Sequence, residues 1–91
     1  MTKETRGRKP YTRDERIFGV EICERLAEIR SRSGLNKTDF ARRIGVMYST
    51  VLLWETGDVV PMLLPLARVA KEFDVSLDWI VFGKETDNEK V

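Results

Sequence analysis

The feature that most restricts the fold of this chain is a pair of short helical segments joined by a glycine turn. Asn36 is a good N-cap for the first segment, which begins at Lys37 and stops at Gly45. Counted from Lys37, Ala41 is the fifth residue, Gly45 the ninth and Val51 the fifteenth. A small fifth residue lets two crossing helices approach, glycine adopts a positive φ in the turn without steric cost, and an apolar fifteenth residue locks the pair. The spacing indicates a helix-turn-helix, and an ordinary helical hairpin with a glycine turn is the alternative.

A longer helix precedes this pair. It begins at a capping box formed by Thr12 and Glu15, and it ends at Ser33 and Gly34. Apolar residues recur along it every three or four positions, which predicts one buried face. The residues of this face are Phe18, Ile22, Leu26 and Ile29.

The second helix of the pair has an inward face and a marked end. Val51 and Trp54, three residues apart, are its expected buried contacts, and Gly57 provides its C-terminal stop. Met47 stands at its N-cap position and has no side-chain acceptor that can cap the helix. We therefore expect this helix over residues 48–56.

Two more helices complete the fold. Pro65 lacks an N–H and is tolerated only in the first turn of a fourth helix, while Ser76 caps a fifth helix that Gly83 ends. Their apolar stripes are Leu66, Val69, Ala70 and Phe73 in the fourth helix and Leu77, Ile80 and Val81 in the fifth. Five helices without an alternating strand pattern predict a compact all-α domain.

Charge is unevenly spread along the 91 residues. The net charge is +1, and residues 1–13 hold five cations and one anion, +4 in sum, so that residues 14–91 sum to −3. We divide the chain into a basic flexible arm over residues 1–12, a helix-turn-helix domain over residues 13–83 and a polar tail over residues 84–91.

The composition argues against catalysis, metal binding and membrane insertion. Histidine is absent and Cys23 is the single cysteine, which leaves no metal cluster and no histidine-dependent triad. We expect no enzyme, no metal and no other cofactor, and we expect Cys23 to be a half-buried side chain in a reducing cytoplasm. The longest apolar stretch, residues 59–66, is interrupted by two prolines and is too short for a membrane span. The charged N-terminus is unlike a signal peptide.

Three stretches of the sequence carry a family resemblance. They are residues 35–46, LNKTDFARRIGV, residues 49–57, STVLLWETG, and residues 64–83, LPLARVAKEFDVSLDWIVFG. With these motifs, residues 18–83 resemble the lambda-repressor-like, Xre-type helix-turn-helix family of Cro and phage repressors. The resemblance implies a five-helix domain that binds a double-stranded DNA operator, with the third helix in the major groove and the start of the second helix at a phosphate.

The resemblance also implies roles for individual residues. Lys37 is expected to contact a phosphate. Arg30 is expected to pair with Glu55 and so to tie the first helix to the third. The other predicted DNA contacts of the helical domain are Arg43, Tyr48, Ser49, Thr50, Leu52 and Leu53.

The sequence departs from the family pattern at the surface expected to meet DNA. The first residue of the second helix is usually a glutamine, and Lys37 supplies a flexible point charge instead. The loop over residues 57–60, usually polar or basic, is acidic and apolar here. Leu52 and Leu53 cannot hydrogen-bond base edges and could touch only thymine methyl groups or another protein. The alternative function is therefore a protein-interaction module that binds another regulator through this face.

The arm carries a second candidate DNA contact. Residues 6–10, RGRKP, resemble the core of an AT-hook, in which Arg6, Arg8 and Lys9 enter a narrow A·T minor groove. An unstructured basic tail is the alternative. The position of the arm directly before the first helix lends support to the DNA contact.

Together these patterns predict a sequence-specific transcriptional regulator of phage or prophage repressor type that acts in the cytoplasm, on the nucleoid. A homodimer is expected on two-fold operators. Its candidate contacts are the apolar residues left outside the core, Val59, Val60, Met62 and Phe82. In a monomer the same residues would cover the edge of the core. A helical domain without a specific partner is a third interpretation.

Overall fold

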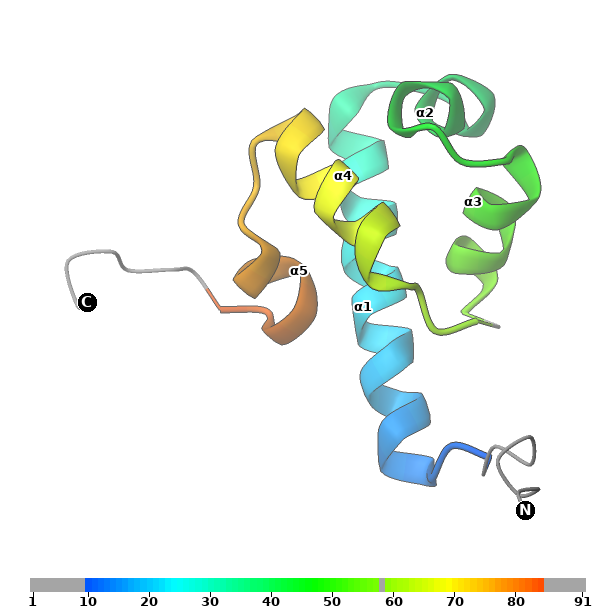
Figure 1. Cartoon of the computed structure of the whole chain (residues 1–91), viewed down its shortest axis with the longest axis vertical. Coiled ribbons are helices and arrows are strands. Elements are labelled where there is room, and N and C mark those ends of the chain that lie inside the picture. Colours follow the sequence, from blue (N-terminus) through cyan, green and yellow to red (C-terminus); the bar gives the residue numbers. More distant parts are fainter. Residues whose placement is uncertain (1–9, 58, 85–91) are drawn as a thin grey trace, which may run out of the picture.

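The computed structural model describes residues 10–57 and 59–84, while residues 1–9, residue 58 and residues 85–91 lie outside it. Five helices follow one another along the described chain (Figure 1): α1 Arg13–Ser33, α2 Lys37–Ile44, α3 Tyr48–Thr56, α4 Leu63–Phe73 and α5 Leu77–Phe82. The described residues contain no strand. None of these helices is long and apolar enough to cross a bilayer. The predicted all-α fold of five helices is confirmed.

The helix starts follow local hydrogen-bonding rules. Thr12 and Glu15 form the predicted capping box, in which the Thr12 N–H donates to Glu15 Oε1 at 2.8 Å and the Glu15 N–H to Thr12 Oγ1 at 3.1 Å. At the start of α2, Asn36 Oδ1 accepts the Asp39 N–H at 2.8 Å. Met47 makes no side-chain cap hydrogen bond to α3, as expected. Short-range capping hydrogen bonds therefore mark where α1 and α2 begin.

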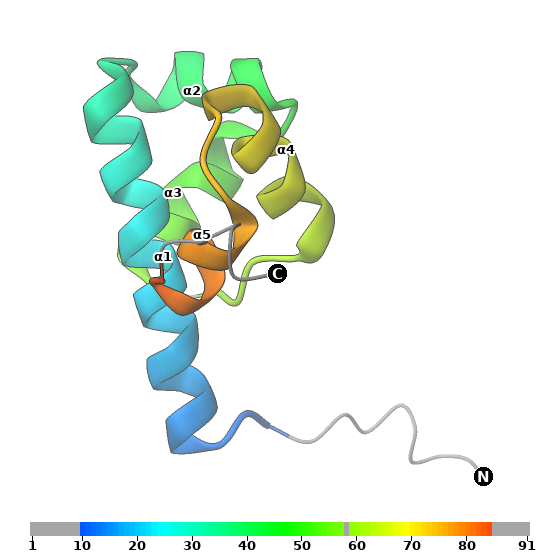
Figure 2. The same ribbon diagram turned by 90° about the vertical axis from the view of Figure 1, so that its left-hand side faces the viewer.

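Helix α1 extends past the helices that pack against it, as two perpendicular views show (Figures 1 and 2). Phe18, in the second turn of α1, was predicted to be buried and is 41% exposed. Its ring lies beside that of Phe82, with the centroids 6.0 Å apart. The prediction was wrong because apolar periodicity identifies one face of a helix without showing how far along it the neighbouring helices reach.

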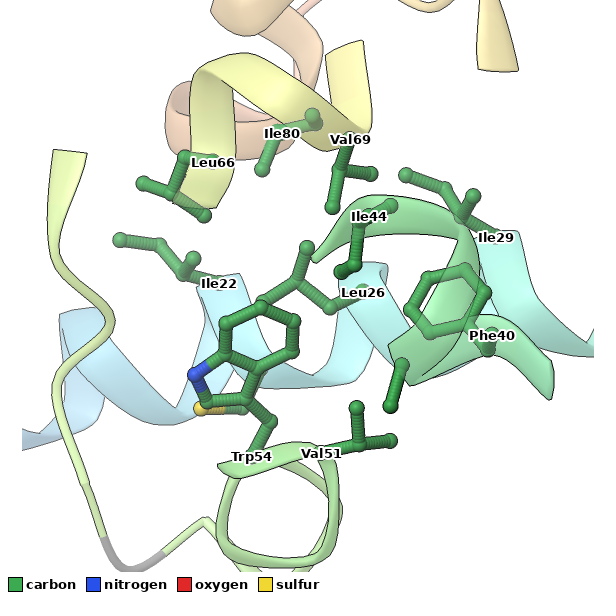
Figure 3. Packing of buried hydrophobic residues seen from close by; sticks show 12 residues of the cluster. Ile22, Leu26, Ile29, Phe40, Ile44, Val51, Trp54, Leu66, Val69 and Ile80 are labelled. Carbon is green, nitrogen blue, oxygen red and sulfur yellow. The ribbon is translucent and has the colours of Figure 1, made fainter. Parts of the chain in front are cut away.

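The core lies where α2, α3, α4 and α5 meet the later turns of α1 (Figure 3). Trp54 points from α3 toward Ile22 and Leu26 of α1. The ring of Phe40 stacks on that of Phe73 with a centroid separation of 5.1 Å, which joins α2 to α4. The buried cluster consists of Ile22, Cys23, Leu26, Ile29, Phe40, Ala41, Ile44, Val51, Trp54, Leu66, Val69 and Ile80.

Cys23 is more deeply buried than expected, with 2% of its surface exposed. Its thiol donates to the Val59 carbonyl at 3.3 Å. Burial, helped by the nearby charge of Glu24, raises the pKa of the thiol to about 11. The thiol therefore stays protonated and unreactive at neutral pH. Cys23 acts as a core side chain that also holds the connection between α3 and α4.

Candidate nucleic-acid interface

The α2–α3 unit has the geometry that a helix-turn-helix requires. Gly45 ends α2 with φ at 73°, and the Val46 N–H donates to the Ala41 carbonyl at 3.0 Å. Ala41 and Val51 are buried in the same cluster, and α2 packs directly on α3. The small Ala41 side chain permits this close approach. The core therefore holds α3 by one face and leaves its other face at the surface.

The outward face of α3 carries the residues that were predicted to meet bases. Tyr48, Ser49, Leu52 and Leu53 are exposed, and Thr50 is half-buried. The structure brings all five together on two turns of one helix, because the residues between them point into the core. Their contact with DNA remains a prediction.

Glu55, at the end of α3, joins three helices. Arg30 of α1 reaches it with two hydrogen bonds, from Nε to Oε2 at 2.5 Å and from Nη2 to Oε1 at 3.1 Å. Arg30 also donates from Nη1 to the Leu35 carbonyl at 2.9 Å, and its hydrogen bonding to Glu55 raises its pKa. Lys37 Nζ lies 4.0 Å from Glu55 Oε1. The structure thus brings together Arg30 and Glu55, the pair predicted from the sequence, and it places Lys37 beside them.

Lys37 occupies the position from which it was expected to contact a phosphate. It is the first residue of α2, and its side chain is about one-third exposed. The unpaired N–H groups of a first helical turn favour anions. Two cations and one carboxylate, from Arg30, Lys37 and Glu55, leave a net positive charge beside this helix end. A phosphate contact by Lys37 is consistent with that charge.

Arg43 points to a different neighbour. Its Nε donates to Glu72 Oε2 at 2.8 Å, and its guanidinium lies 5.4 Å from the centroid of the Phe73 ring. These contacts hold Arg43 against α4, and its contact with DNA stays a prediction. Outside the described residues lie the three predicted contacts of the arm, Arg6, Arg8 and Lys9.

Arg68 of α4 is a cation beside this site that sequence analysis missed. Its Nη1 donates to the Gly45 carbonyl at 3.2 Å, next to the turn that leads into α3. No ion pair within residues 10–57 and 59–84 includes it. Residues 44–67 contain no Lys or Arg, so local sequence gave no sign of positive charge here. Only the packing of α4 on α2 brings Arg68 to the turn.

An open groove of about 610 Å³ runs beside α3. Met47 and Leu53 line it from the α3 side, and Val59, Pro61 and Met62 line it from the connection to α4. Leu53 therefore borders both the groove and the outward face. Such apolar walls suit contact with methyl groups or another apolar surface. Nowhere in the described part of the chain do His, Cys, Asp and Glu side chains gather in threes that could hold a metal ion.

Two short helices set across a glycine turn, with the second exposing one face, define a helix-turn-helix of the DNA-binding class. A family model described as Helix-turn-helix (HTH_3) matches residues 26–80. The match covers more than half of the chain, and the chain belongs to this helix-turn-helix family. The predicted membership in the lambda-repressor-like group is thereby confirmed.

Proteins described as HTH-type transcriptional regulators are similar to this chain. The HTH-type regulator YgzD of Bacillus subtilis is 33% identical over 64 residues, which cover 70% of this chain and 96% of the relative. The HTH-type activator BcrR of Enterococcus faecalis is 27% identical over 66 residues, and these cover 72% of this chain and 32% of BcrR. An HTH-type regulator of Haemophilus influenzae is 36% identical over 47 residues, 52% of this chain and 20% of the relative. The chain therefore spans a third or less of two relatives and nearly all of YgzD.

Proposed function

We propose that this chain is a sequence-specific transcriptional regulator of phage or prophage repressor type that inserts α3 into the major groove of an operator. The observation that carries the proposal is the exposed outward face of α3 on a helix held by the core. An α-helix fits the major groove of B-DNA, and the first turns of a recognition helix meet base edges there. Tyr48 and Ser49 stand in the first turn of α3, and Leu52 and Leu53 in the second.

Phosphate contacts come from cations that flank α3. Lys37 stands at the start of α2, and Arg68 stands beside the turn between α2 and α3.

We also assign a contact to the arm, whose Arg6, Arg8 and Lys9 suit a narrow minor groove. Deleting residues 1–10 should then flatten the salt dependence of binding by about 0.9 units of slope for each phosphate that the arm neutralises in the parent. An unchanged slope would show that the arm does not bind.

The proposed regulator acts as a homodimer. Val59, Met62 and Phe82 are exposed and Val60 is half-buried. Leu63 and Leu64, in the first turn of α4, extend the exposed apolar surface beside Met62. Surfaces of this kind mark interaction sites, and a two-fold dimer spans half-sites about 34 Å apart. Sedimentation of the parent and of Leu63→Asp tests this assignment, with a dimer expected only for the parent.

The proposed activity is binding without catalysis. It requires neither a metal nor another cofactor, because phosphate and base contacts use side chains alone. An operator target places the protein in the cytoplasm, with the nucleoid.

Selection from a random pool of duplex DNA tests the proposal. The parent protein should enrich a short sequence with two-fold symmetry, and its affinity for that sequence should fall as salt rises. A pool from which the parent enriches nothing would overturn the proposal.

A second candidate function is a protein-interaction module that binds another regulator through α3. The observation that favours it is the lack of Lys and Arg over residues 44–67, since DNA-binding surfaces are normally cationic. The test pairs the DNA selection with affinity capture of partners by the parent and by Leu53→Gln. A parent that enriches no DNA, together with a partner that no longer binds the variant, supports this candidate. Leu53 would then be a buried anchor of the complex.

A further inference from the structure

The helical period of α3 places two small hydroxyl residues at the centre of its outward face. At about 100° per residue, Ser49 and Thr56 point directly away from the buried face. Leu52 and Leu53 flank them on either side and are 41% and 44% exposed. The larger side chains of this face are therefore the two leucines and Tyr48, which is 49% exposed at the start of the helix.

This face offers few hydrogen bonds to bases. The Thr56 hydroxyl donates to the Leu53 carbonyl at 2.9 Å, so its proton is used within the helix. Tyr48, Ser49 and the half-buried Thr50 supply the other hydroxyls on this side of the helix. Helix α3 contains no Arg, Lys, Asn or Gln, the side chains that read guanine and adenine through paired hydrogen bonds. Apolar contact is therefore the main source of base discrimination that α3 can provide.

Apolar contact in the major groove has one main target, the C5-methyl group of thymine. 5-Methylcytosine carries a methyl group on the same ring carbon and presents it in the same groove. On the protein, Met47 lines the open groove beside α3 together with Leu53, and it widens the apolar edge of this helix. A face of this kind distinguishes pyrimidines by their methyl group, whichever base pair carries it.

We propose that α3 selects its operator through pyrimidine C5-methyl groups, with Leu52 and Leu53 as the specificity-determining residues. Thymine and 5-methylcytosine are then equivalent wherever these leucines make contact, and cytosine methylation at such a position raises affinity. This inference rests on the proposed function, because α3 must enter the major groove to meet the methyl groups.

The direct test uses unmodified protein and modified DNA. Each thymine of a selected site is replaced singly by uracil, which keeps the base pair and removes only the methyl group. At a contacted thymine the affinity should fall about fourfold, the effect of one methyl group leaving an apolar contact. The same T·A pair is then changed to C·G or to 5-methylcytosine·G. The methylated duplex should bind about fourfold more tightly than the unmethylated one.

Protein variants assign the effect to residues. In Leu52→Ala or Leu53→Ala, uracil should no longer weaken binding at the thymine that the missing side chain contacted. Ile17→Ala is the matched control, because Ile17 is similarly exposed, at 50%, but lies on α1, outside α3. This control should retain the full uracil effect. Circular dichroism melting verifies that all three variants are folded.

The possible outcomes distinguish a failure of methyl recognition from a failure of the proposed function. A selected site that tolerates uracil at every thymine overturns methyl recognition and leaves the proposed function standing. A uracil effect that persists in both leucine variants overturns the assignment to Leu52 and Leu53. A parent protein that selects no DNA sequence overturns the proposed function, and methyl recognition with it.

Discussion

The inward face of α3 carries Val51 and Trp54, and its outward face carries Leu52 and Leu53, so four consecutive apolar residues divide between core and surface. The inward pair is 0% and 2% exposed, whereas both leucines are exposed. Large apolar side chains on both faces of a helix are normally buried on both faces. Here no neighbouring helix covers one side in the described chain, and that side is the natural place for a partner. Packing therefore explains the inward residues, and contact with a partner explains the outward leucines.

Truncating the inward face should have the largest effect. Trp54→Ala removes a fully buried ring between α3 and α1 and should lower the free energy of unfolding by about 3–5 kcal/mol. Urea denaturation followed by circular dichroism measures the change. Leu53→Ala is the outward control, expected within about 0.5 kcal/mol of the parent. Equal destabilisation of the two variants would show that the inward and outward faces contribute equally to stability.

The next largest effect should come from Glu55, at the border of the two faces. Glu55→Ala leaves the Arg30 guanidinium partly buried without its carboxylate and should cost about 3 kcal/mol of stability. Glu28→Ala is the control, because Glu28 pairs with Arg32 at 2.6 Å on the exposed surface of α1. Such surface pairs contribute about 0.3–0.5 kcal/mol. A Glu55→Ala protein that melts at the parental temperature would show that the pair does not stabilise the position of α3.

A polar substitution on the outward face should change specificity and leave the fold intact. Leu53→Gln adds an amide that can form paired hydrogen bonds with adenine. The sequence selected from a random pool should therefore change at one base pair, where adenine should become the preferred base on the contacted strand. Thermal stability should stay within about 0.5 kcal/mol of the parent. Sequencing of the selected pools measures the shift. Identical selected sequences from parent and variant would show that Leu53 does not contact bases.

The smallest effect should come from Lys37, which lies at the start of α2 and not on the outward face of α3. Lys37→Ala should weaken binding to all sequences alike and reduce the slope of log affinity against log salt by about 1. Titrations of the selected site and of a scrambled duplex at several salt concentrations measure both quantities. Weakening confined to the selected site would instead indicate that Lys37 contacts a base.

Prediction from sequence succeeded where the governing contacts are short-range. The capping residues Thr12, Asn36 and Ser76 were identified because each bonds an N–H three residues ahead. The outward position of Leu52 and Leu53 followed from the helical period. The pairing of Arg43 with Glu72 was missed, because the two residues are 29 positions apart and meet only when α4 docks on α2.

The sequence by itself determined the five helices and the two faces of α3, because capping, glycine turns and a 3.6-residue period act within a few positions of the chain. Tertiary structure alone decided which end of α1 stays uncovered, leaving Phe18 exposed, and which cation lies beside the α2–α3 turn, placing Arg68 there. It also decided that Arg25 of α1 caps the end of α5, donating to the carbonyls of Ile80 and Val81 at 2.8 and 2.9 Å. The physical reason is that these contacts join residues 23 to 56 positions apart. Their geometry depends on how all five helices pack together, and no local pattern encodes it.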